Sequence, residues 1–129
     1  MKKLICCAII AAVLLSAVIF EQIYLKNSFD TLISKIDALD QQIVAASTIN
    51  TTKINQSVQD IQNYWQQVEQ ILCMTINYND LQRLGEQFKR VKSYVQLDQK
   101  EDCLAELEVL AYYAQNYKDI FILRFSNIF

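Results

Sequence analysis

The feature that most constrains this chain is an uncharged apolar stretch at residues 4–20 that runs, without a helix breaker, into a heptad pattern. The stretch LICCAIIAAVLLSAVIF follows Met-Lys-Lys, and with residues 23–25 it reaches about 22 residues, close to the roughly 20 that a helix needs to cross a bilayer. Apolar residues then recur at alternating steps of four and three, which is typical of a packed helical seam. That seam comprises Leu25, Phe29, Leu32, Ile36, Leu39, Ile43 and Ala46. The pattern predicts one helix from residue 3 to residue 46, about 65 Å long.

The apolar stretch could be a cleaved signal peptide or a retained membrane anchor. A signal peptide needs small residues at positions −3 and −1 of the cleavage site. Cutting after Ala17 leaves Leu15 at −3, and cutting after Val18 leaves valine at −1, so neither site fits. A lipoprotein signal ends at its modified cysteine, whereas Cys6 and Cys7 stand at the start of the apolar stretch. We therefore expect an uncleaved anchor.

Charges flanking the anchor predict its orientation. Lys2 and Lys3 lie on one side and Glu21 on the other, and the positive-inside tendency places the lysines in the cytoplasm. The expected organisation is a cytoplasmic tip at residues 1–3, a transmembrane anchor at 4–25 and an extracytoplasmic domain at 26–129. The predicted location is the cell membrane, crossed once.

Composition favours an all-α fold, because the chain has one glycine and no proline, residues that β-rich folds need at their turns. Helical patterns recur after polar breaks, at 47–52 and before Asp80, and Asp98 is expected to cap the last helix. The predicted exterior helices span residues 26–46, 51–76, 79–97 and 99–121. Short connections favour an antiparallel up-down-up-down four-helix bundle, with the first helix continuing from the anchor.

Two sets of residues are candidates for contacts outside the bundle. Small residues spaced by four on one face of the anchor let membrane helices approach closely; they are Ala8, Ala12 and Ser16. The fourth helix returns to the membrane in this topology, so aromatic residues near its end are candidates for contact with the membrane surface or a partner; they are Phe121, Phe125 and Phe129.

Other unusual residues are better explained by packing. Trp65 occupies a seam position and is expected in the core. Gly85, inside the third helix, is explained by close helix packing. The bundle places Cys73 and Cys103 roughly 30 Å apart, too far for a disulfide.

The composition also argues against several classes of activity. The chain has no histidine, a single glycine and a net charge of −2 with both signs interspersed. It therefore lacks the usual general base, a phosphate-binding loop and a basic surface for nucleic acid. We expect no catalytic residues, no metal site, no cofactor and no enzymatic activity.

Six segments together resemble an uncharacterised domain-of-unknown-function family of small, single-pass, membrane-anchored helical proteins, found mainly in spore-forming Gram-positive bacteria. These segments are MKKLI, the apolar run, the heptad helix that follows it, the Trp65 segment QNYWQQVEQIL, LDQKEDCLAELEVL and the terminal NIF. The resemblance implies an envelope location and a helical exterior domain, and it implies no activity or catalytic residues.

Two functions remain open from the sequence. The first is a non-catalytic envelope protein whose exterior bundle binds an unidentified membrane or envelope protein, or a second copy of the chain. The alternative is an extracytoplasmic ligand-sensing bundle that acts through a partner membrane protein, because a bundle can hold a small ligand between its helices.

Overall fold

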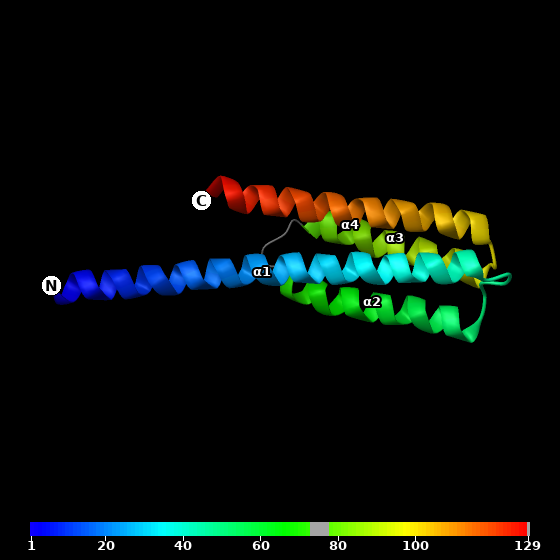
Figure 1. Ribbon diagram of the computed structural model, residues 1–129, viewed down its shortest axis with the longest axis horizontal. Coiled ribbons are helices and arrows are strands. Elements are labelled where there is room, and N and C mark those ends of the chain that lie inside the picture. The colour runs from blue at the N-terminus through cyan, green and yellow to red at the C-terminus, as the bar shows by residue number, and fades with distance from the viewer. Residues whose placement is uncertain (73–77, 129) are drawn as a thin grey trace.

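The computed structural model describes residues 1–72 and 78–128, with residues 123–128 described by their backbone alone. The described residues form four α-helices and no strand, which confirms the all-α prediction. The helices are α1 (Lys2–Ala45), α2 (Thr52–Leu72), α3 (Tyr78–Gln96) and α4 (Lys100–Ile128), shown in Figure 1. The predicted anchor and the first heptad seam as far as Ile43 lie in one unbroken helix, because no proline or glycine interrupts them. Ala46, the last predicted seam residue, follows the end of α1 with an extended backbone.

The four helices lie side by side, and α1 extends well beyond the others at its N-terminal end (Figure 1). Each helix packs against two neighbours, since α1 and α3 both contact α2 and α4 but not each other in the described part of the chain. Polar contacts fix the alignment of α1 with α4: Lys118 pairs with Asp30, and Lys100 reaches the end of α1. We call the end of the molecule where α1 gives way to α2 and α3 to α4 the distal end.

The core is built by the heptad positions that the sequence marks. Every seam residue of α1 from Leu25 to Ile43 is buried, as are the seam residues of the other three helices. Aromatic rings join three of the helices at the centre, with ring centroids 6.3 Å apart for Phe29 and Trp65 and 6.1 Å apart for Trp65 and Phe88. Trp65 is therefore a core residue, as predicted from its heptad position.

Hydrogen bonds between two connections close the distal end. Asp98 has a left-handed backbone conformation (φ 56°), and its carboxylate accepts hydrogen bonds from the backbone N–H groups of Ile49 (2.7 Å) and Asn50 (3.2 Å). Ile49 is fully buried, at 0% exposed, and covers the end of the core. The expectation that Asp98 caps its own helix is thus wrong: its carboxylate holds the connection between α1 and α2.

The helix ends differ in places from the predicted spans. α4 continues past residue 121 to Ile128, because the terminal residues contain neither proline nor glycine to end it. α2 is described as far as Leu72, so the predicted end at residue 76 lies outside the described residues.

Candidate functional site

A groove of about 800 Å³ runs along the outside of the bundle between α1 and α4. It extends from Asp30, on the side of the predicted anchor, to Val44 at the distal end of α1. These residues are 14 positions apart, which corresponds to about 21 Å of helix. Grooves of this size are within the range that binds ligands or partner segments.

The floor of this groove, which we call the α1/α4 groove, is apolar. Seam residues and their neighbours form it, including Ile33, Ile36, Leu104 and Leu107. The groove is wide because small side chains line it on both helices, at Ser34 on α1 and at Ala105 and Ala111 on α4. Larger side chains at these three positions would fill the space between two packed helices.

Carboxylates gather on both walls of the groove. Asp37 and Asp40 lie on α1, one turn apart, and Glu108 lies on α4. Partial burial, together with the negative charges of Asp37 and Glu108, raises the pKa of the Asp40 carboxyl. Like charges on one helix face and across an interface repel each other, so a cation placed in this part of the groove would be stabilised by all three groups.

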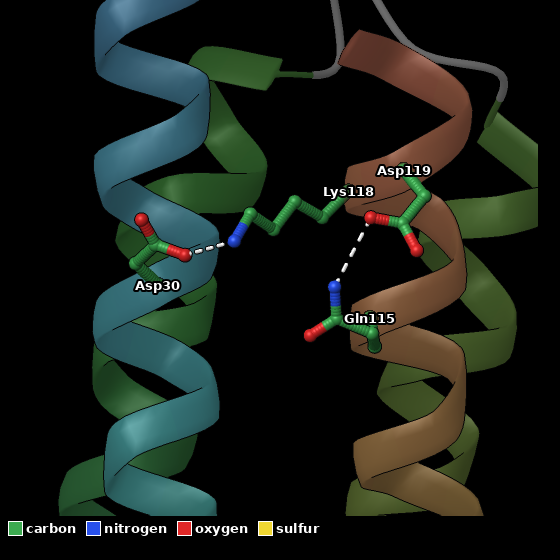
Figure 2. Close-up of polar contacts among 4 residues, drawn as sticks. All are labelled: Asp30, Gln115, Lys118 and Asp119. Carbon is green, nitrogen blue, oxygen red and sulfur yellow. Dashed lines mark hydrogen bonds and ion pairs between the residues drawn. The ribbon is translucent and has the colours of Figure 1, made fainter. Parts of the chain in front are cut away.

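Lysines from α4 lie at the two ends of the groove. Near the anchor side, Lys118 reaches across from α4 to pair with Asp30, while Gln115 and Asp119 bond to each other along α4 (Figure 2). At the distal end, Lys100 Nζ donates to the carbonyl oxygens of Val44 (3.0 Å) and Ala46 (2.8 Å), which are free acceptors at a helix C-terminus. Both lysines are therefore engaged, and neither neutralises Asp37, Asp40 or Glu108.

A second, smaller groove of about 300 Å³ lies between α2 and α3 and includes Trp65, Phe88 and Gly85 in its lining. A Cβ atom built on Gly85 meets nothing within 4 Å, so the expectation that close packing explains this glycine is wrong. Within the described residues, the buried indole Nε1 of Trp65 has no hydrogen-bond partner. The walls carry glutamine and glutamate side chains and Lys89, a mixed polar lining.

The small residues proposed from sequence for helix association lie apart from both grooves. Ala8, Ala12 and Ser16 are exposed on the N-terminal part of α1, and the Ser16 hydroxyl donates to the Ala12 carbonyl oxygen (2.8 Å) in its own helix. Their role in helix association stays a prediction.

Of the three aromatic candidates near the end of α4, the structure describes the side chain of Phe121 alone. Phe121 is only 4% exposed and packs against Phe29, with ring centroids 6.0 Å apart. The prediction that Phe121 contacts the membrane surface or a partner is therefore wrong, because its seam position turns it into the core. The side chain of Phe125 and all of Phe129 lie outside the described residues.

Cys103 is a free, fully buried thiol beside α3. Burial, with a smaller effect from the negative charge of Asp40, raises the pKa of the Cys103 thiol to about 11, so the thiol stays protonated and unreactive near neutral pH. Cys73 lies outside the described residues, so its separation from Cys103 stays a prediction. Elsewhere in the described chain, no three histidine, cysteine, aspartate or glutamate side chains are arranged to hold a metal ion.

The N-terminal part of α1 is long and apolar enough to cross a membrane. None of its most apolar stretch of 18 residues is buried inside the described structure. A signal sequence has the same length and composition. The class of protein that the described residues define is therefore an all-α protein of four helices, the first of which is long and apolar.

Comparison with family models places the chain in one family. Residues 19–128 match the family described as Domain of unknown function (DUF4363), so the chain belongs to that family. Neither the curated proteins nor the solved structures contain a match to this chain. The match begins within the apolar part of α1 and covers the bundle as far as the last described residue.

Proposed function

We propose that this protein is a non-catalytic envelope protein whose helical domain, tethered to the cell membrane, binds another protein through the α1/α4 groove. The observation that carries the proposal is the groove itself: an apolar floor beside three carboxylates that no cation of the described chain neutralises. Apolar surface with complementary charge at its edge is the usual composition of a protein-binding surface.

The proposed topology follows from α1. Its residues 4–25 span the membrane with the N-terminus in the cytoplasm, and residues 26–129 form an antiparallel up-down-up-down bundle outside. Three observations support it: none of the most apolar stretch of α1 is buried by the rest of the chain, the lysines precede it, and α4 returns alongside α1 towards the anchor (Figure 1). N-terminal sequencing of the native protein tests retention of the anchor, since a start near residue 20 would show cleavage.

Site-specific photo-crosslinking in intact cells tests the groove. A photoreactive amino acid at Ser34, an exposed groove residue, is expected to give a discrete adduct, whereas the same amino acid at the exposed Asn63 on α2 gives none. Repeating the experiment at Ala105 probes the opposite wall. Absence of adducts at both groove positions, with the variants present at wild-type levels, would contradict the proposal.

A second candidate function, an extracytoplasmic ligand sensor acting through a partner membrane protein, is favoured by the groove between α2 and α3. Gly85 has no packing reason to be glycine, and it lines that groove together with Trp65. A screen of small polar compounds against the full chain in detergent would support sensing if one compound raised the midpoint of thermal unfolding. A Gly85→Leu variant, which fills the groove, should abolish that rise.

A further inference from the structure

The last turns of α4 lie alongside the outer end of the predicted membrane anchor. α4 runs back along α1 (Figure 1), and the ion pair between Lys118 and Asp30 fixes the register of the two helices. Counting along both helices from this pair, at the same rise per residue, places Ile128 at about the height of residue 20. Residues 123–128 of α4 therefore lie at the height of residues 20–25, which end the predicted anchor.

The exposure of residues along α1 supports this register. Residues 1–17 are exposed, whereas Val18 and Gln22, which continue the seam from Leu25 towards the N-terminus, are half-buried. The rest of the chain therefore contacts α1 as far as Val18, a residue inside the predicted anchor.

Among the described helices, α1 is the neighbour of α4 at this height. Gln87 of α3 donates a hydrogen bond to the carbonyl oxygen of Glu106 on α4 (2.9 Å), which places Tyr78, the first residue of α3, at about the height of residue 115. α4 continues about 20 Å beyond that height, and α2 makes no contact with α4 in the described part of the chain. The side of these turns that faces away from α1 is therefore not covered by α2 or α3.

Both helices change from polar to apolar sequence at nearly the same height. On α1, Ile23 is 54% exposed and the next exposed polar residue is Lys26. On α4, the exposed Asp119 is followed by the run IFILRFSNI, whose first residue, Ile120, is 37% exposed. By the register of the two helices, these changes lie within about one helical turn of the same height. A membrane surface accounts for this coincidence, because it is a plane that both helices meet.

The composition at this height fits the headgroup layer of a membrane. Glu21 on α1, and Arg124 and Asn127 on α4, lie in sequence among apolar residues. Mixed apolar and charged helices bind at the boundary between headgroups and acyl chains, not in the hydrocarbon centre. Arginine is tolerated there, since a long side chain can keep its charge in water while its methylene groups contact lipid. The occupant that this surface fits is therefore lipid.

We propose that residues 120–128 of α4 form a second membrane contact, in the headgroup layer of the outer leaflet beside the anchor. The inference rests on the proposed function, because it needs the anchor to stay in the membrane, and it goes beyond the binding of a protein in the groove. The domain is then attached to one surface twice, by α1 through the membrane and by α4 upon it. These two attachments hold the bundle upright, with the Asp30 side of the α1/α4 groove next to the membrane.

Tryptophan fluorescence of the full chain in vesicles tests this contact, because brominated acyl chains quench a tryptophan that they touch. Trp65, the single tryptophan, is replaced by phenylalanine, and Leu123, Phe125 and Ile128 are replaced by tryptophan one at a time. The vesicles contain phosphatidylcholine and phosphatidylglycerol with bromine near the headgroup end of the acyl chains. At one or more of the three positions, the loss of fluorescence should be within about twofold of that at Phe20→Trp, since both lie in the same layer.

Matched controls place the tryptophan outside the headgroup layer. Tyr112→Trp, at a position of α4 that is 66% exposed and further from the anchor, should lose about tenfold less fluorescence, because its height is above the membrane. Leu14→Trp should be quenched most by bromine near the far end of the acyl chains. Circular dichroism confirms that each variant is folded. If Trp65→Phe does not fold, Trp65 is kept, since it is 2% exposed in the core and adds a background that the wild type measures.

Two results would overturn the second contact while leaving the anchor in place. In both, Leu14→Trp and Phe20→Trp are quenched and none of the three α4 positions is. Blue-shifted emission from α4 would then show that protein covers it in place of lipid, and unshifted emission would show that it lies in water. Absence of quenching at Leu14→Trp and Phe20→Trp would remove the proposed topology together with the second contact. The groove is judged separately, by the Ser34 photo-adduct.

Discussion

The two halves of α1 have the same backbone conformation but different surroundings. Phe20, in the N-terminal half, is 71% exposed, whereas Phe29, little more than two turns later, is 1% exposed. In the first half nearly every position is apolar, so no face is distinguished; in the second half apolar residues keep to one seam and polar residues cover the rest. The comparison shows that a continuous helix can be stabilised by lipid along one part and by neighbouring helices along the other.

Replacing Phe29 or Phe20 with alanine should give the largest difference in stability between the two halves of α1. Phe29→Ala is expected to lower the free energy of unfolding of the bundle by about 4 kcal/mol, because it leaves a cavity among Trp65 and Phe121. Phe20→Ala should change it by less than about 0.5 kcal/mol. Denaturant unfolding of the full chain in detergent measures both; equal effects would show that the halves are not energetically distinct.

A charge placed in the N-terminal half of α1 should impair membrane insertion, whereas a charge in the bundle half should not. Leu14→Arg is expected to cost about 3 kcal/mol of membrane insertion, since arginine at the centre of a membrane helix is unfavourable. Thr31→Arg, at an exposed position of the bundle half, should leave insertion unchanged. Alkaline extraction of membranes measures the retained fraction, and complete retention of the Leu14→Arg protein would argue against a membrane-spanning segment.

The Asp98 carboxylate accepts two of the hydrogen bonds that close the distal end of the bundle half. Asp98→Ala removes the acceptor for the Ile49 and Asn50 N–H groups and is expected to cost about 2 kcal/mol of stability. Asp98→Asn keeps an acceptor oxygen and suits the left-handed backbone, so it should cost less. Thermal unfolding of the two variants compares them; equal losses would mean that backbone conformation, not hydrogen bonding, decides this position.

Gly85 lies within the bundle, yet a Cβ atom added there would meet nothing within 4 Å. Gly85→Ala should stabilise the protein by about 1 kcal/mol, because a methyl group fits the open space and alanine favours the helix. The midpoint of thermal unfolding should rise. A destabilised variant would show that something approaches the glycine in the folded protein.

The smallest effect concerns the pH dependence of the bundle half. Because the pKa of Asp40 is raised in the folded protein, the folded state binds the proton more tightly than the unfolded state does. Stability from this group should therefore decrease as pH rises from its unfolded pKa near 4 through its folded pKa. Asp40→Asn should stabilise the protein at pH 7 and flatten this part of the profile, as followed by unfolding at pH 4 to 7; a steeper profile would contradict the cause assigned.

Sequence periodicity alone determined the helical part of this structure. Steps of three and four mark one face of a helix whatever packs against it, so the seams, the core position of Trp65 and the unbroken α1 could all be predicted. The seam position of Phe121 also predicts its burial, although the aromatic residues that follow it led us to propose contact with the membrane surface or a partner. Local sequence could not show that the Asp98 carboxylate bonds to residues 48 positions away.

Only the tertiary structure decided where the grooves lie and what they contain. Asp37 and Asp40 were visible as like charges one turn apart, yet their relation to Glu108 depends on how α1 and α4 align. The free space beside Gly85 likewise depends on the separation of α2 and α3. A sequence specifies which residues share a helix face, but the distance between faces is set by packing between helices, which is a property of pairs of elements and not of either one alone.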